Sequence, residues 1–284
     1  MSDVYITDEH TQIIPNIDYS ATYGHQKHVP VNDFSLEDLP VCYQHAEMFD
    51  LIRSLADLTV KIEVKGVGKR RKQYWSAAQR TCVVKDLGKG EVMFGSGKVD
   101  DVFFRTEKDG QCPCDECLIC PKKEWGEIRI LTSAQLLYDD EDAKHFSCTL
   151  FYDDDQQIDV RYIRGHRVVV RNVERDLLMF MCSTCDLDLI RKLEGMLDRF
   201  EACWENAFDK YVHTVQWDSE RLVVIVSHPY GGKKHVSLGK KSYGIEVKPS
   251  KGINYDTPTY QGSAGTFVLI PDFDVKDDIV PKIC

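Results

Sequence analysis

The clearest pattern of hydrophobic and polar residues lies between residues 186 and 212. Apolar residues recur there at three- and four-residue steps, and the polar positions between them mix acidic and basic side chains. This pattern predicts one amphipathic helix, about 37 Å long, whose apolar stripe faces a core. A membrane-binding or partner-binding helix is the alternative, which the mixed charges disfavour. The stripe consists of Leu189, Leu193, Met196, Phe200, Cys203, Ala207 and Tyr211.

Elsewhere the pattern is mostly that of short strands. A second helix is predicted over 43–58, where apolar residues recur every three positions, and Val60, Ile62 and Val64 then alternate with charged residues as in a strand. Many short strands punctuated by glycines favour a barrel or a sandwich. The predicted strands after residue 75 are 81–84, 91–94, 99–104, 128–132, 148–152, 167–170, 221–227, 235–239, 244–247 and 266–270.

These elements divide the chain into four segments. Two β-rich regions flank the long helix, and a polar, irregular stretch precedes the first of them. We expect an N-terminal arm with a helix and a strand (1–72), a first β-barrel with a cysteine-rich insertion (73–185), the inserted helix (186–212) and a second β-barrel (213–284).

Charge and composition exclude several classes of function. The 284 residues include 46 acidic and 36 basic ones, which leaves a net charge of −10. An acidic chain is not a general binder of nucleic acid, and the basic run 65–72 is interpreted as a solvated loop, with a localisation or nucleic-acid patch as the alternative. No apolar run is long enough to span a membrane. The N-terminus lacks the features of a signal peptide, so we expect a cytoplasmic protein.

Several motifs occur in an order that is typical of one enzyme family. A Gly-Ser-Gly strand (95–99) precedes Thr132-Ser133-Ala134; an Asp-Leu-Leu segment follows at 176–178; Ser-His-Pro-Tyr-Gly (227–231) precedes a Gly-Ser-Ala-Gly turn at 262–265. Their order and spacing resemble the trypsin-like serine peptidases (chymotrypsin fold, peptidase S1, PA clan). The resemblance implies a mostly β fold of two barrels. The long inter-barrel helix and the N-terminal arm with its helix depart from the family.

The resemblance assigns roles to four positions. Gln135 stands at the position of the catalytic histidine, Asp176 at that of the aspartate, and Ala264 at that of the nucleophilic serine. The backbone N–H groups of Gly262 and Ala264 correspond to the oxyanion hole. A glutamine cannot shuttle a proton near neutral pH and an alanine has no hydroxyl, so the base and the nucleophile are both replaced.

Two functions are consistent with this pattern. The first is a pseudoenzyme that binds an extended peptide or protein between the barrels without cutting it. The alternative is an active intracellular endopeptidase, a hydrolase, in which Ser263 is the nucleophile or in which Gln135 and Ala264 replace the residues of a working site. Asp176 also has a structural interpretation, as the residue that ends or caps a strand. The histidines that can supply a base are His145, His166, His213, His228 and His235.

The cysteines suggest a metal site. Cys112, Cys114, Cys117 and Cys120 lie within nine residues, and thiolates are good zinc ligands. A distant residue such as Cys148 can complete such a set. Free thiols or disulfides are the alternatives, and zinc is the only cofactor that the sequence suggests. Cys182 and Cys185 form a further Cys-x-x-Cys pair, which we interpret as inert buried thiols in preference to a redox pair.

Overall fold

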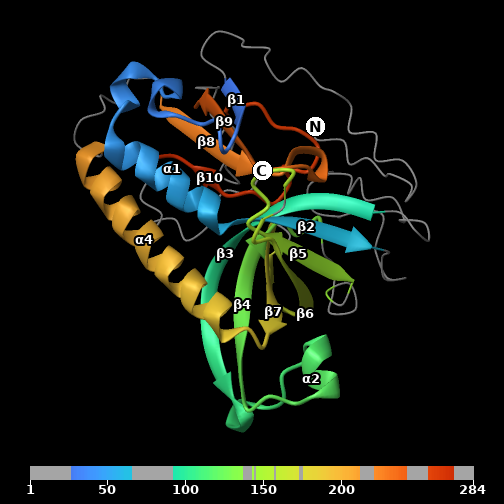
Figure 1. Ribbon diagram of the computed structural model, residues 1–284. Helices are drawn as coiled ribbons and strands as arrows, with labels where there is room; N and C mark the ends of the chain where they lie inside the picture. Colours follow the sequence, from blue (N-terminus) through green and yellow to red (C-terminus); the bar gives the residue numbers. More distant parts are fainter. Residues whose placement is uncertain are drawn as a thin grey trace.

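Two β units and two packed helices make up the protein in the computed structural model (Figure 1). The first unit is a closed six-stranded barrel and the second is a four-stranded sheet, so the prediction of a mostly β chain is confirmed. The predicted strands 81–84 and 244–247, the basic run beyond Lys65 and the first 26 residues lie outside the described part. The structure describes residues 27–65, 92–136, 143, 145–156, 158–172, 175–211, 221–241 and 255–271.

The barrel strands are antiparallel, in the spatial order β2-β3-β4-β7-β6-β5. Val60, Ile62 and Val64 of β2 are fully buried, and β2 pairs with both β3 and β5. The barrel therefore begins before residue 73, where the sequence placed its start, because β2 is needed to close it. The strands are β2 (Thr59–Lys65), β3 (Val92–Thr106), β4 (Glu124–Thr132), β5 (Phe146–Leu150), β6 (Arg161–Asn172) and β7 (Leu177–Thr184).

Strand β3 is one strand of 15 residues, although two strands separated by glycines were predicted there. A Cβ atom on Gly97 would lie 2.9 Å from both Ile62 Cδ1 and the Leu131 carbonyl oxygen. The glycine therefore allows neighbouring strands to approach closely and does not end the strand. The irregularity in β3 is a register shift between Val99 and Asp101.

The second unit has the strand order β1-β9-β8-β10. Its first strand comes from the N-terminal segment, because residues 27–30 pair with β9. The N-terminal arm therefore contributes to this unit, which the sequence did not predict, and the described residues of the unit form an antiparallel sheet where a second barrel was expected. The strands are β1 (Lys27–Pro30), β8 (Leu222–Ser227), β9 (His235–Lys240) and β10 (Val268–Leu269).

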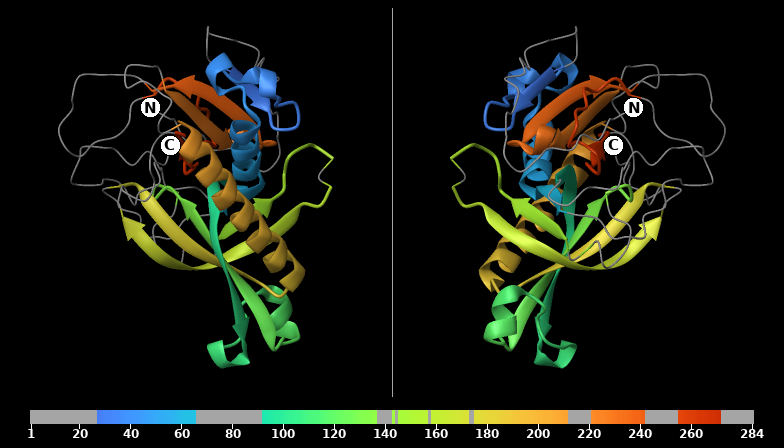
Figure 2. Two further views of the ribbon diagram at one scale, coloured as in Figure 1. Left: turned by 90° about the vertical axis from the view of Figure 1, so that its left-hand side faces the viewer. Right: turned by 90° about the vertical axis from the view of Figure 1, so that its right-hand side faces the viewer.

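Two helices join the units on one side, as Figures 1 and 2 show. Helix α1 (Ala46–Leu58) packs against α4 (Leu187–Tyr211), which also contacts β3 and β4. Near the second unit, Phe200 and Trp204 of α4 meet Phe267 in edge-to-face contacts at 6.3 and 6.4 Å. Helix α4 thus connects the barrel to the sheet, and its predicted bounds are correct to within one residue at each end.

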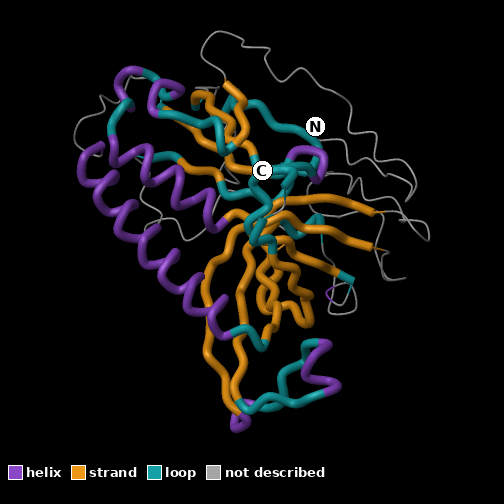
Figure 3. The backbone as a smooth tube through the Cα atoms, viewed as in Figure 1, coloured by secondary structure: helices purple, strands orange, loops and turns teal. Residues whose placement is uncertain are grey.

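The remaining helical segments are short (Figure 3). Helix α2 (Asp115–Ile119) lies in the connection between β3 and β4. Among the described residues, no helix combines the length and the apolar character that a membrane crossing requires. The 3₁₀ helices are Leu36–Asp38, Val41–Tyr43, Glu107–Asp109 and Pro229–Gly231.

Candidate functional site

Asp176 and Gln135 meet at the end of the barrel where β4 ends and β7 begins. The amide group of Gln135 donates a hydrogen bond to the Asp176 carboxylate, with Nε2 2.9 Å from Oδ2. The hydroxyl of Ser133 donates to the same carboxylate, at 2.8 and 2.9 Å from its two oxygens. Asp176 therefore holds the loop after β4 by its side chain.

The backbone reinforces this contact. Asp176 adopts a left-handed conformation with φ of 52°, and its carbonyl accepts the N–H of Ala134 at 3.3 Å. Aspartate tolerates this conformation better than most residues. The residue thus receives hydrogen bonds from 133–135 through both its side chain and its backbone, which supports the structural interpretation of Asp176 as well as the resemblance.

The glycine turn packs against the same loop. Gly265 has φ of +89°, and a Cβ atom on it would overlap Thr132 Oγ1 and the Ser96 carbonyl oxygen. Ser96, fully buried in β3, donates to the turn twice: its N–H to the Ala264 carbonyl at 2.8 Å and its hydroxyl to the Gly262 carbonyl at 2.7 Å. The turn therefore lies beside 132–133. We call the contact region of Ser133, Gln135, Asp176, Gly262 and Gly265 the Asp176 junction.

Several backbone donors of this turn have no partner among the described residues. They include the N–H groups of Gly262 and Ala264, the two positions that the resemblance assigns to the oxyanion hole, as well as that of Gly265. Gly262 is buried with φ of +90°, where a side chain would overlap the His228 carbonyl oxygen. Unpaired backbone N–H groups at a buried turn are rare, and a carbonyl or carboxylate oxygen from outside can satisfy them.

Ser263 is a poor nucleophile in this geometry. It is 2% exposed, and its Oγ lies 3.0 Å from Ser227 Oγ and accepts the N–H of Tyr260 at 3.2 Å. Its backbone N–H donates to the Tyr260 carbonyl at 2.9 Å, which closes the turn. The hydroxyl thus stabilises the turn and has little access to a substrate.

The described histidines have structural surroundings or lie at the surface. His228 is fully buried, donates from Nδ1 to the Gly232 carbonyl at 2.9 Å, and burial holds its pKa well below the ordinary value. His235 bonds the Lys233 carbonyl through Nδ1 at 2.9 Å, and burial lowers its pKa. His166 interacts with Ser183, while His145 is exposed. Position 213 lies outside the described residues, so its prediction stays untested.

A separate group of side chains lies at the far end of the barrel. The Sγ atoms of Cys112, Cys114 and Cys117 all lie within 4.8 Å of one another. Cys114 and Cys185 both pack beside the buried Cys112, Cys117 and Trp125. We call Cys112, Cys114, Cys117 and Cys185 the cysteine cluster.

Cys120 lies apart from the three grouped sulfurs. It is exposed and is not among the sulfurs that lie within 4.8 Å of one another. Helix α2 ends at Ile119, and Cys120 is already extended, with φ of −134° and ψ of 90°. Cys148 lies inside the barrel, where its sulfur is 4.0 Å from that of Cys182. It therefore does not complete the set.

Cys182 and Cys185 are not partners of each other. Cys182 is fully buried in β7, whereas Cys185 follows the last residue of that strand. Residues three apart along a strand point to opposite faces, so the Cys-x-x-Cys spacing by itself argued against a pair. This alternation separates the two cysteines once β7 (Leu177–Thr184) is known, and that strand was not predicted from the sequence.

The cluster has an uneven distribution of charge. Burial raises the pKa of Cys112, and burial together with a hydrogen bond to Glu116 raises that of Cys185 to about 12. Burial also acts to raise the pKa of Cys114, but hydrogen bonds from the Cys117 backbone and the neighbouring thiols outweigh it and lower the pKa. The pKa of Cys114 is thus shifted in the opposite direction from those of Cys112 and Cys185.

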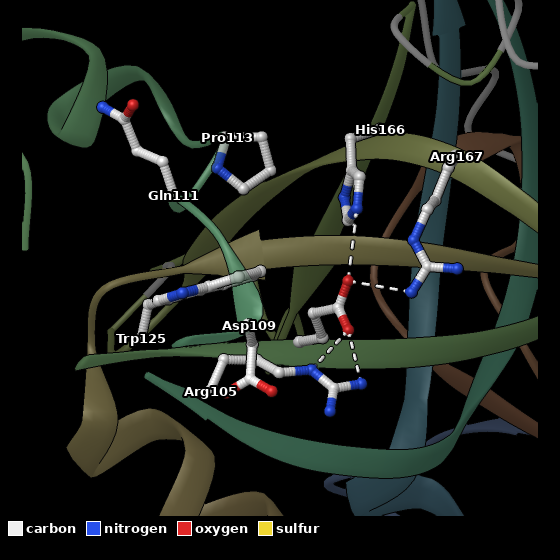
Figure 4. Close-up of a pocket in the computed structure, with 8 residues that line it drawn as sticks. Arg105, Asp109, Gln111, Pro113, Trp125, His166 and Arg167 are labelled. Carbon is white, nitrogen blue, oxygen red and sulfur yellow. Dashed lines mark hydrogen bonds and ion pairs between the residues drawn. The ribbon is translucent and has the colours of Figure 1, made fainter. Parts of the chain in front are cut away.

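A hollow of about 490 Å³ adjoins the cluster (Figure 4). Dashed lines in the figure run from Arg105, His166 and Arg167 to one carboxylate, that of Glu127, which is 3% exposed. Burial acts to raise the pKa of Glu127, but hydrogen bonds from the two arginines outweigh it and lower the pKa. The hollow is also lined by Asp109, Gln111, Pro113 and Trp125.

This hollow was missed by the sequence reasoning, because its residues come from three different strands. Two arginines face two carboxylates, those of Glu127 and Asp109, so the formal charges cancel when the imidazole is neutral. The lining therefore gives no reason to expect an anionic or cationic ligand.

Comparisons with known proteins add little to this geometry. No protein-family model and no curated protein matches the chain. Among solved structures, the crystal structure of Deg5 is similar to this chain. The alignment covers 82% of this chain and 83% of the Deg5 chain, with 14% sequence identity and a TM-score of 0.40. An overlap of this strength carries no conclusion about activity.

Proposed function

We propose that this chain is a non-catalytic scaffold of the trypsin-like serine peptidase type, which binds an extended segment of a peptide or protein beside the Gly262–Gly265 turn. The observation that carries the proposal is the contact between Gln135 Nε2 and Asp176 Oδ2 at 2.9 Å. A glutamine at this place receives the orientation that a catalytic histidine needs, yet it has no basic nitrogen.

The turn supports binding without cleavage. The free N–H groups of Gly262 and Ala264 offer two donors to a carbonyl oxygen of a bound chain, whereas Ala264 has no atom that can attack it. Such donors contribute to binding as well as to catalysis. An extended peptide can supply the matching acceptor from its backbone, and this mode of recognition depends little on side chains.

A labelling experiment separates this function from that of an active endopeptidase. The purified full-length chain is incubated with a fluorophosphonate probe, which modifies activated serines, and the products are analysed by mass spectrometry. We expect no label on the natural chain. Covalent label on Ser263 would establish an active nucleophile and overturn the proposal.

The same probe tests whether the rest of the site is intact. The double variant Gln135→His with Ala264→Ser restores both replaced groups, and each single variant is the control. Label on the serine of the double variant alone would show that only these two groups are missing. Absence of label would show that the geometry has drifted beyond what two substitutions restore, and the natural chain would remain a non-catalytic protein.

Binding itself needs a direct measurement. A display library of random extended peptides is selected on the immobilised protein, and the affinity of the selected peptides is measured by calorimetry. Ala264→Arg places a long side chain beside the free donors, so it should weaken binding at least about tenfold. Val41→Arg, at a position that is 84% exposed, is the matched control. Peptides that bind both variants equally, or a library without any binder, would contradict the proposal.

A further inference from the structure

Four sulfurs from two distant segments converge at the end of the barrel near α2. Those of Cys112, Cys114 and Cys117 lie within 4.8 Å of one another, and Cys185 packs against the same buried group. In a tetrahedral zinc site with Zn–S bonds of about 2.3 Å, neighbouring sulfurs are about 3.8 Å apart. The three grouped sulfurs therefore already lie close to the spacing that one zinc ion requires.

The local backbone explains why these three converge. The N–H groups of Cys117 and Leu118 donate to the Cys114 carbonyl at 3.1 and 3.2 Å, which forms one helical turn. Residues three apart in such a turn share a face, so Cys114 and Cys117 point the same way. Cys112, two residues earlier, is 1% exposed and reaches the same place from the incoming chain.

Cys185 supplies the fourth ligand from the opposite segment. It follows Thr184, the last residue of β7, and precedes Leu187, where α4 begins. Its sulfur packs against the buried group of Cys112, Cys117 and Trp125 and donates to Glu116 Oε2 at 2.9 Å. We propose that Cys112, Cys114, Cys117 and Cys185 bind one structural Zn²⁺ ion, and that Cys120 takes no part.

The surroundings fit a buried structural ion. Trp125 packs against Cys112 and Cys117 and is 5% exposed, so its ring shields the sulfurs on one side. The Gln111 side chain donates to the Cys117 carbonyl at 3.3 Å and holds the turn. Four protein ligands leave no open coordination position, which is the arrangement of structural sites rather than catalytic ones.

The ion joins two segments that are far apart in the chain. The three grouped cysteines belong to the β3–β4 connection, whereas Cys185 stands at the start of the helix that links the barrel to the sheet (Figure 1). Gln111, Pro113 and Trp125 from the same region line the hollow of Figure 4. Zinc therefore fixes both the beginning of α4 and one wall of this hollow.

A pair of matched variants distinguishes the two candidate ligand sets, in which the fourth ligand is either Cys185 or Cys120. The full chain is purified in the presence of zinc and a reductant, free metal is removed, and bound metal is measured by mass spectrometry. We expect one equivalent of zinc in the natural chain and in Cys120→Ser. Cys185→Ser should bind zinc at least about tenfold more weakly, because a ligand is lost. Loss in Cys120→Ser with full binding in Cys185→Ser would overturn the assignment of Cys185.

Cobalt reports the ligands directly, which matters if Cys185→Ser folds poorly. Co²⁺ bound by four thiolates gives intense sulfur-to-metal charge-transfer bands and the strong visible absorption of a tetrahedral site. Cys185→His keeps a ligand at this position, so it should retain the metal with weaker charge transfer and a shifted visible spectrum. An unchanged spectrum in Cys185→His would exclude Cys185 as a ligand. A natural chain that binds no metal, or that carries a disulfide within the cluster after purification under reductant, would overturn the proposal entirely.

Discussion

The Asp176 junction and the cysteine cluster resolve the same problem in opposite ways. At the junction, the Asp176 carboxylate accepts hydrogen bonds from the hydroxyl of Ser133, shared between its two oxygens, and from the amide group of Gln135. In the cluster, sulfur faces sulfur, and thiols are weak donors and weak acceptors. The charged group of the junction is therefore satisfied by the protein, whereas crowded thiols are stabilised far more by a cation.

This difference indicates which region should gain stability from a bound metal and which should not. The side-chain contacts of the junction should contribute to stability without a ligand, and the N–H groups of the adjoining turn can bind one, while the cluster should depend on metal for its full stability.

Metal removal should produce the largest change. With free zinc about 1,000-fold above its dissociation constant, binding adds about 4 kcal/mol to the free energy of unfolding. For a chain of this size that corresponds to a fall in Tm of roughly 8 °C or more when a chelator is added. Cys120→Ser should show the same fall, measured by calorimetry, and Asp176→Asn should keep it as well. A Tm that is insensitive to the chelator would remove the contrast between the two regions.

A methyl group at Gly265 should damage the junction. The added Cβ would overlap Thr132 Oγ1 and the Ser96 carbonyl, and the backbone is in the left-handed region with φ of +89°. We expect Gly265→Ala to lower the free energy of unfolding by about 3 kcal/mol in urea titrations.

The control for this variant is Gly110→Ala. Gly110 also has a positive φ, +114°, but no atom lies within 4 Å of the added Cβ, so only backbone strain of about 1 kcal/mol applies. Equal losses in the two variants would mean that the close packing at the turn contributes nothing. The junction would then be a contact between two loops that does not stabilise the fold.

Acid should act on the protein even without zinc. The ring of His28 stacks on that of His235, with centroids 4.6 Å apart, and its centroid lies 4.4 Å from that of Tyr260. Burial, and to a smaller extent the charge of His235, lowers the pKa of His28 to about 3. The unfolded chain therefore takes up this proton near pH 6.5 while the folded chain does not, so stability falls as the pH drops from about 6.5 toward 3.

The measurement is a series of urea titrations between pH 7 and pH 4 on zinc-free protein, which removes the effect of thiolate protonation. His28→Asn should reduce the slope of stability against pH by at most about 1.4 kcal/mol per pH unit. His145→Asn, at an exposed position, is the control and should leave the slope unchanged. An unchanged slope in His28→Asn would show that this histidine does not control the acid response.

The sequence predicted the local elements better than the connections between them. The helix over 187–211 and the strand over 59–65 follow from periodicity, because their patterns extend over many residues. The pairing of β1 with β9 and of β2 with β5 joins segments far apart in the chain, and no local pattern reports such pairing. The barrel boundary and the place of the N-terminal arm were therefore not predictable from periodicity.

The candidate sites divide in the same way. Gln135, Asp176 and the turn at 262–265 were predicted from motifs in a fixed order, and the structure brings them into one region. In the cluster, nearness in sequence selected Cys120, whereas packing brings in Cys185, which lies 68 residues beyond Cys117 (185 − 117). Local spacing cannot identify a ligand that the fold delivers from another strand.

The smallest expected effect concerns Gln135 itself. Gln135→His exchanges one donor to the Asp176 carboxylate for another at an exposed position, so the free energy of unfolding should change little. The neighbouring carboxylate should raise the pKa of the new imidazole above about 6.5, as followed by NMR titration, and Asp176→Asn in the same background should reverse that rise. An imidazole that titrates identically in both backgrounds would show that the contact at the junction does not survive the exchange. In that case a histidine at this position would not be oriented by Asp176, and exchanging the side chain at position 135 would not by itself build an oriented base on this loop.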